Sequence, residues 1–185
     1  MAKADDYLPS QTEVDHILYS KKIVNFQGAQ WKQKPNRAGM WLQMHLLPID
    51  EDFIPVQGLT FELLWKPDQD SKADASLTYP KINIVALYNK KRVFAVDTYP
   101  FDKHTNTFQI ACSNFQKIIF GAHYHVYYEE AGYYSERIAF PITNDISPDD
   151  LVEYWKFFCQ QLNITYFGRL PLPLEDESGQ MGFGI

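Results

Sequence analysis

The sequence predicts an α+β protein with a mostly antiparallel sheet of about five to six strands, a short N-terminal helix and a C-terminal amphipathic helix packed on one face of the sheet. Two observations support this class. Segments with the period-two alternation of half-buried strands follow one another through the middle of the chain, without a regular alternation of strands and helices. Apolar residues at helical spacing lie near both ends of the chain.

The length and composition are those of a globular protein. The 185 residues suit one domain, and we expect a globular unit at residues 1–168 followed by an extended tail at residues 169–185, which contains Pro and Gly. Aromatic residues are unusually frequent, with 13 Phe, 12 Tyr and 4 Trp. Because each buried tyrosine hydroxyl needs a hydrogen-bond partner, some of the tyrosines should form a recognition surface.

The charge balance restricts the possible partners. The net charge is −6, and no compact basic block offsets acidic runs such as residues 50–52. Non-specific duplex nucleic acid is therefore not expected as a partner, because it is bound through many Lys and Arg contacts. The start of the chain lacks the apolar core of a signal peptide, and no stretch approaches the roughly 20 apolar residues of a membrane span. We expect a cytoplasmic protein with no membrane partner.

A helix and two strands are predicted first along the chain. Ser10 and Glu13 have the spacing of a capping box, which predicts a helix near residues 11–20. Apolar and polar residues then alternate from Trp41 onward and again around residues 60–66, as in half-buried strands.

A hairpin follows a polar segment. Residues 67–80 are rich in Asp, Ser and Lys and are predicted to be a mobile loop. Residues 81–88 and 92–98 read as two strands closed by a three-residue turn at residues 89–91, where Asn89 can adopt a left-handed conformation.

The next segments are predicted to be a helix and a second hairpin. Apolar residues within 106–120 match helical spacing, and Gly121 would cap such a helix. Cys112 of this segment, like Cys159 farther on, has apolar neighbours and is expected to be a buried free thiol. Residues 123–130 and 134–142 should then form the second hairpin.

The last helix has the clearest pattern. Ser147 is predicted as its cap and Pro148 as its first residue. Its core-facing stripe should comprise Leu151, Trp155, Phe158 and Leu162. In the tail, Met181, Phe183 and Ile185 alternate with polar residues or glycine, and they could dock on their own domain or join two chains as a homodimer.

The densest group of titratable side chains lies at residues 123–129. If this segment is a strand, His123, His125, Tyr127 and Glu129 share one face. Two imidazoles two residues apart can share a metal ion or a phosphate. The alternative is that both histidines lie on a solvated sheet face or bond to neighbouring strands, and the sequence leaves this open.

A divalent metal is the one cofactor that the sequence suggests. His123 and His125 would supply two ligands, and a third would come most plausibly from the Asp102-Lys103-His104 loop, with Asp102 as its carboxylate. Glu129 lies too far along the strand to share an ion with His123, whereas Asp97 is a further candidate.

A metal-free phosphodiesterase uses the same residues. His123, His125 and His104 would act as general acid and base, with Lys103, Arg92 or Arg137 stabilising the developing charge and Tyr127 stacking a base. A small ribonuclease of the kind found among prokaryotic toxins fits this description, and RNA would then be the partner.

The tyrosine-rich hairpin favours a third reading, a protein-binding surface. We take this as the leading hypothesis, because no nucleotide-loop, zinc-protease or serine-hydrolase motif occurs in the chain. The histidine-dependent hydrolase is the alternative, and an acidic inhibitor of a nucleic-acid enzyme is a weaker one. The contact surface would comprise the acidic loops with Tyr127, Tyr128, Tyr133, Tyr134 and Glu129.

Overall fold

The computed structural model describes residues 7–37, 39–70, 78–132 and 137–175. These residues form two α-helices, α1 (Gln11–Tyr19) and α2 (Leu151–Gln161), a 3-10 helix at Glu129–Ala131, and eleven strands. The strands are β1 (Lys22–Asn25), β2 (Lys32–Gln33), β3 (Leu42–Leu46), β4 (Leu59–Asp70), β5 (Thr78–Tyr88), β6 (Lys91–Asp97), β7 (Lys103–Thr105), β8 (Ile118–Phe120), β9 (His123–Val126), β10 (Ala139–Pro141) and β11 (Ile164–Phe167).

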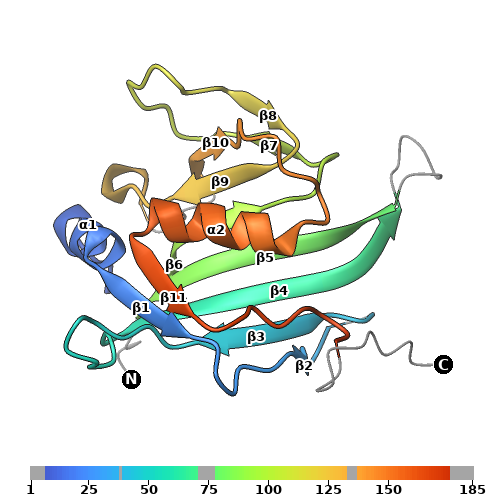
Figure 1. The fold of residues 1–185 in the computed structure, drawn as a ribbon. Helices are drawn as coiled ribbons and strands as arrows, with labels where there is room; N and C mark the ends of the chain where they lie inside the picture. Colours follow the sequence, from blue (N-terminus) through green and yellow to red (C-terminus); the bar gives the residue numbers. More distant parts are fainter. Residues whose placement is uncertain (1–6, 38, 71–77, 133–136, 176–185) are drawn as a thin grey trace, which may run out of the picture.

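A large antiparallel sheet dominates this part of the chain, which confirms the predicted α+β class (Figure 1). Among the described residues it has seven strands, in the order β10-β9-β6-β5-β4-β3-β2, rather than five to six. Two small pairs accompany it: β1 and β11 run parallel, and β7 and β8 form an antiparallel pair. None of the described helices is long and apolar enough to cross a membrane.

Helix α2 covers one face of the sheet, and the core lies between them. Phe158 is fully buried, with its ring centroid 5.3 Å from that of Phe61 and 5.6 Å from that of Phe94. The predicted stripe is confirmed, since every member is at least 96% buried: Leu151, Trp155, Phe158 and Leu162.

The N-terminal helix begins as predicted. The Ser10 side chain accepts a hydrogen bond from the Glu13 backbone, and the Glu13 carboxylate accepts one from the Ser10 backbone. At its other end the buried Lys22 ammonium donates to the carbonyl oxygens of Ile17, Leu18 and Ser20. These bonds satisfy carbonyls that a helix end leaves without intrahelical donors.

The first hairpin is longer and tighter than predicted. Strand β4 reaches Asp70 and β5 begins at Thr78, so the predicted loop at residues 67–80 is wrong at both ends, and residues 71–77 lie outside the described part. Strands β5 and β6 join through two residues, Asn89 and Lys90, with φ of 48° and 66°. Two consecutive positive φ values define the two-residue turn whose twist matches that of the strands, which the prediction of a three-residue turn missed.

Helix α2 begins three residues later than predicted. Asp150, not Ser147, is its N-cap and accepts a hydrogen bond from the Glu153 backbone at 3.0 Å. Residues 147–150 form a turn closed by a bond from the Asp150 N–H to the Ser147 carbonyl. Proline suits the second position of such a turn as well as the first turn of a helix, so Pro148 fitted both.

The predicted helix at residues 106–120 is wrong. The segment is a loop that ends in β8, and Cys112 is exposed rather than buried, whereas Cys159 is buried as expected. The backbone N–H groups of Thr107 and Phe108 bond to the Arg137 carbonyl instead of to a helical neighbour. Asn, Ser and Thr favour such irregular backbone, because their side chains compete for backbone hydrogen bonds.

The second hairpin is present but short. Strands β9 and β10 pair antiparallel, with His125 opposite Ala139 and His123 opposite Pro141. The strand that begins at His123 ends at Val126 and the 3-10 helix follows, so the predicted strand to residue 130 is wrong in its second half. Residues 133–136 lie outside the described part.

The C-terminal segment is partly described. Leu170 is buried in the core, and the Pro171 carbonyl accepts a hydrogen bond from the Trp31 indole at 2.9 Å. The residues proposed to dock or to join two chains, Met181, Phe183 and Ile185, lie outside the described part.

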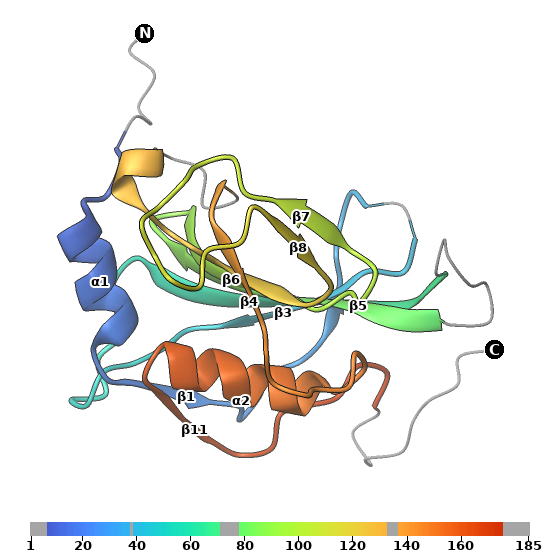
Figure 2. The ribbon, with the colours of Figure 1, turned by 90° about the horizontal axis from the view of Figure 1, so that it is seen from above.

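The second face of the sheet carries polar side chains. The register places Asn83 opposite Asp97, and Asp97 opposite His123, so their side chains project from the same face, away from α2. Figure 2 shows the sheet nearly edge-on, with α2 on one side and the β7–β8 pair on the other. The loop between β2 and β3 rises on the same side as β7 and β8.

Candidate metal centre

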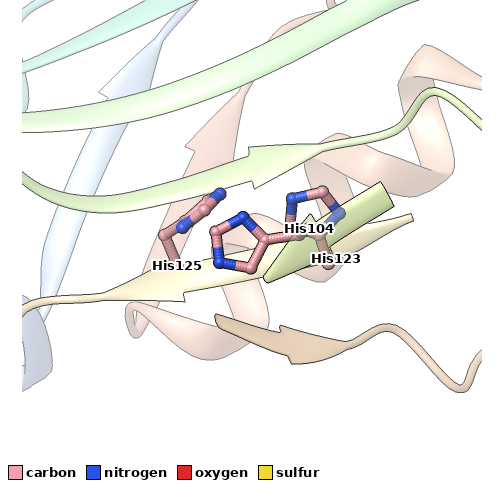
Figure 3. Close-up of side chains that lie close together, drawn as sticks. All are labelled: His104, His123 and His125. Atoms are coloured by element: carbon pink, nitrogen blue, oxygen red, sulfur yellow. The ribbon is translucent and has the colours of Figure 1, made fainter. Parts of the chain in front are cut away.

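Three histidines meet between β9 and β7 (Figure 3). His123 and His125 project from one face of β9, and His104 projects from β7 toward them. The ring centroid of His104 lies 5.1 Å from that of His123 and 4.8 Å from that of His125, and the last two are 4.9 Å apart. Of the strand predicted at residues 123–129, the part that carries both histidines, residues 123–126, is extended.

The sheet provides space for this cluster. His125 has Ala95 on one neighbouring strand and Ala139 on the other, and both alanines are fully buried. Such small neighbours leave room for the imidazole. His123 and His125 are themselves 96% and 97% buried, in a polar cluster that is separate from the apolar core.

In His123 and His104, the ring nitrogen that points away from the cluster, here called the outer nitrogen, faces a hydrogen-bond acceptor. The acceptor determines which nitrogen carries the proton. Nδ1 of His123 lies 2.8 Å from the Gly121 carbonyl oxygen, so it must carry the proton. Nε2 of His104 lies 3.2 Å from Oδ1 of Asn106, whose own amide nitrogen donates to two backbone carbonyls. Because each acceptor requires an N–H donor, the other nitrogen of each neutral ring keeps a lone pair: Nε2 of His123 and Nδ1 of His104.

In His125 the acceptor of the outer nitrogen is a carboxylate. Its Nε2 donates to Oδ2 of Asp97 at 3.0 Å, and the Asn83 side-chain amide holds the other oxygen of Asp97. Nδ1 of His125 is buried and has no hydrogen-bond partner among the described residues. A buried polar atom without a partner normally costs free energy. The Trp155 indole nitrogen in the core has none among these residues either, but the nitrogen of His125 differs in lying beside two further imidazoles.

The electrostatics favour neutral imidazoles at His104 and His123 beside a charged Asp97. Burial lowers the pKa of His123 below its ordinary value, and burial together with the rings of His125 and His123 lowers the pKa of His104 to about 4. Burial alone would raise the pKa of Asp97, but the hydrogen bond from His125 and the electrostatic influence of His125, His123 and Arg92 bring it to about 2. Neutral imidazole is the form of histidine that binds metals.

The three histidines are close enough to hold one metal ion if their rings move together by about an ångström. One ring nitrogen from each of the three histidines lies within 4.8 Å of the other two, whereas ligands of a tetrahedral zinc ion are about 3.3 Å apart. Nε2 of His123 and Oδ2 of Asp97 are 3.7 Å apart, although neither can donate a hydrogen bond to the other. Asp97 would serve a bound ion as the outer partner that holds the His125 N–H.

The cluster opens into a pocket of about 380 Å³. The three histidines, Asp97 and Asp102 line it together with the cations Arg92 and Lys103. A metal bound here would therefore keep a position that a ligand from solvent can reach, as catalytic zinc sites do.

Of the other residues predicted for the site, Asp102 and Lys103 line the pocket and Arg137 does not. Asp102 lines the pocket but forms an ion pair with Lys81 at 3.0 Å, and the carboxylate that contacts the cluster is that of Asp97. Lys103 also lines the pocket, and its ammonium lies 5.9 Å from the centre of the Phe120 ring. Arg137 is exposed, bonds to the Ala131 carbonyl and is not part of the pocket lining.

The predicted contact residues for a protein partner are only partly at the surface. Tyr127 is 97% buried and its hydroxyl donates to the Pro9 carbonyl, so it belongs to the core and cannot stack a base. Tyr128 is half-buried beside Phe108. The Glu129 carboxylate accepts from the first backbone N–H of α1. Tyr133 and Tyr134 lie outside the described part, and the protein-binding surface stays a prediction.

Sequence reasoning missed the outer partners of the histidines. Asp97 was one of four candidate ligands, while Asn83 and Asn106 carried no recognisable motif. The alternation of β6 was the available signal for Asp97, since it places Asp97 beside His123 once β6 and β9 are neighbours. Nothing in the sequence near Asn106 indicates that its side chain bonds to the backbone of Ala139, 33 residues away.

Comparison with known proteins adds no relative to this description. No protein-family model, no curated protein and no solved structure matches the chain.

Proposed function

We propose that this chain is a metal-dependent phosphodiesterase that holds a zinc ion through His104, His123 and His125. One observation carries the proposal. Three imidazoles converge, each with one ring nitrogen hydrogen-bonded to an acceptor outside the cluster, and the second nitrogen of His125 is buried without a partner among the described residues. Metal-binding histidines characteristically show this combination of a free inner lone pair and a bonded outer N–H.

The donor set favours zinc over magnesium or calcium. Imidazole nitrogen suits zinc and its first-row neighbours, whereas magnesium and calcium prefer oxygen ligands. Three histidines with an open fourth position also match the ligand count of catalytic zinc, since structural zinc sites normally have four protein ligands. The pocket beside the cluster supplies that open position.

The charges around the pocket favour an anionic substrate. The cations Arg92 and Lys103 both line the pocket. Zinc lowers the pKa of a bound water to about 7, which generates hydroxide near neutral pH. In diester hydrolysis the water oxygen forms the new bond to phosphorus, and the bond from phosphorus to the leaving alcohol breaks. One proton of the water ends on that alcohol. Arg92 and Lys103 would stabilise the charge that develops on the phosphoryl oxygens.

Zinc titration tests the site itself. The protein is stripped with a chelator, and zinc binding is followed by calorimetry. We expect one equivalent to bind, and His104→Ala to weaken binding at least about 100-fold, because loss of an outer partner alone typically costs 10- to 100-fold. His45→Ala is the matched control, since His45 is an exposed histidine of β3 outside the cluster. Equal affinity in the parent protein and His104→Ala would overturn the proposal.

Hydrolysis tests the activity. The zinc-loaded protein should release 4-nitrophenol from bis(4-nitrophenyl) phosphate, lose this activity with chelator and regain it with zinc. His104→Ala should be inactive and His45→Ala fully active. A protein that binds one zinc tightly yet hydrolyses neither this diester nor a short RNA would retain the metal site and lose the proposed reaction.

A further inference from the structure

A second pocket adjoins the metal centre on the same face of the sheet. It has a volume of about 610 Å³ and is lined by side chains of β4, β5 and β6 and of the loop before β3. Arg92 and Asp97 line both pockets, so the pockets adjoin there, and we call the two together the trough. From β4 to β9 this trough crosses three strand spacings, or about 14 Å.

Trp41 forms a half-buried aromatic platform at the far end of the trough. The Trp41 backbone bonds to Gly39 and to Lys34, and Gly39 has a φ of 83° that suits the turn preceding the platform. The Arg37 guanidinium lies 4.6 Å from the centre of the indole, and the Lys66 ammonium lies 5.9 Å from it. Proteins use aromatic rings together with cations to stack a base and hold its neighbouring phosphates, and a base stacked here would take the place of Arg37 over the ring.

The trough is basic although the chain is acidic. The linings of the two pockets contain four cations, Arg37, Lys81, Arg92 and Lys103, against the two carboxylates of Asp97 and Asp102. In the whole chain 23 acidic residues outnumber 17 basic ones. Asp97 accepts from His125 and Asp102 pairs with Lys81. The trough is therefore a local site for an anion in a chain that would otherwise repel one.

We infer that this trough binds single-stranded nucleic acid, with one base stacked on Trp41 and the adjoining phosphates directed toward Arg92 and the histidine cluster. The inference rests on the proposed phosphodiesterase and names its substrate class. A duplex cannot use the platform, because its bases are stacked on one another, whereas an unpaired base offers a free ring face. The β7–β8 pair and the loop before β3 both rise on this side of the sheet (Figure 2).

Binding without cleavage tests the inference. Metal-stripped protein is titrated into a fluorescein-labelled single-stranded RNA of six nucleotides at low salt, and anisotropy is recorded. Trp41→Ala should weaken binding by about 5- to 150-fold, the range for loss of one base stack, and Trp41→Phe should restore most of it. Arg37→Ala should lower the slope of log affinity against log salt by about 0.7, as one phosphate contact does on a single strand.

Phe167→Ala is the matched control, since Phe167 is an exposed aromatic residue of β11 that lines neither pocket. This variant should bind like the parent. Equal binding by Trp41→Ala, or equal binding of a duplex or of a hexaglutamate peptide, would overturn the inference. If the protein bound zinc at the histidines but bound no RNA, the trough would not be the substrate site, and the proposed zinc site would stand. If the protein bound RNA through Trp41 but bound no zinc, the proposed phosphodiesterase activity would be wrong, and the inference about the trough would stand.

Discussion

The two faces of the large sheet differ in what their buried side chains do. On one face Phe61 and Phe94 pack on Phe158 of α2, and apolar burial of this kind stabilises the fold. On the other face His123 and His125 are also buried and Asp97 is half-buried, but these side chains lie among polar atoms. Burying polar groups costs free energy unless each is paired, and among the described residues one buried nitrogen on each face has no partner, Nδ1 of His125 and Nε1 of Trp155. The first face therefore maintains the fold, whereas the convergence of three imidazoles on the second makes that face the candidate for the proposed metal site.

Truncation on the α2 face should produce the largest loss of stability. Phe158→Ala removes a fully buried ring and should lower the free energy of unfolding by about 3–5 kcal/mol. Zinc affinity of the folded protein should not change, because Phe158 lies on the side of the sheet away from the histidines. Urea unfolding and calorimetry on the same preparation separate the two effects. A large loss of zinc affinity in the folded variant would break the division between the faces.

Removal of an outer partner should weaken the metal site by less than loss of a ligand. Asp97→Asn replaces the acceptor of the His125 N–H by an amide and should weaken zinc binding about 10- to 100-fold. Asp102→Asn is the matched control, since Asp102 lines the same pocket but pairs with Lys81. Its effect should stay within about 5-fold, the size of an exposed ion pair. Equal effects of the two variants would contradict the assignment of Asp97 as the carboxylate that supports the metal site.

The sequence predicts the features that depend on residues close together in the chain, and it fails where distant residues decide the structure. The capping box at Ser10 and Glu13 and the stripe of α2 depend on residues a few positions apart, and both were predicted. Residues 106–120 have apolar residues at helical spacing, yet Ala111, Cys112 and Ile118 are exposed in the structure. The spacing misled because the segment bonds to the distant Arg137 carbonyl and ends in a strand that pairs with β7.

The candidate site was predictable only in part for the same reason. His123 and His125 are two positions apart, so the strand pattern alone places them on one face. Their contact with His104 depends on how the chain returns between residues 98 and 122, which no local pattern specifies. The platform at Trp41 is 56 or more positions from every residue of the histidine cluster, and only the strand order brings its pocket against theirs.

Acid should destabilise the metal-free protein through the second face. The pKa of His104 is lowered to about 4 by burial, then by His125 and His123, whereas an unfolded histidine titrates near 6.5. Between these values the unfolded chain holds a proton that the folded chain lacks, so stability falls as the pH drops from about 6.5 to 4. Above that window this contribution does not vary.

Urea unfolding in chelator at about pH 7, 5.5 and 4.5 measures this dependence. His104→Asn should show a shallower decline, since its side chain does not titrate. The same steepness in parent and variant would assign the decline to other groups.

The smallest effect is expected on the outer side of the β7–β8 pair. Phe120 is 74% exposed, while His104 and Ile119 of the same pair face inward. Phe120→Ser should change the free energy of unfolding by no more than about 0.5 kcal/mol and leave zinc affinity unaltered. A loss of several kcal/mol by urea unfolding would show that this side is covered in solution.

X-ray absorption at the zinc edge tests the central claim most directly, because it reports the atoms bound to the ion. The account predicts three imidazole nitrogens at about 2.0–2.1 Å with one further light ligand, and loss of one imidazole in His104→Ala. A zinc ion with sulfur in its coordination shell, with oxygen ligands alone, or with the same spectrum in His104→Ala would contradict it.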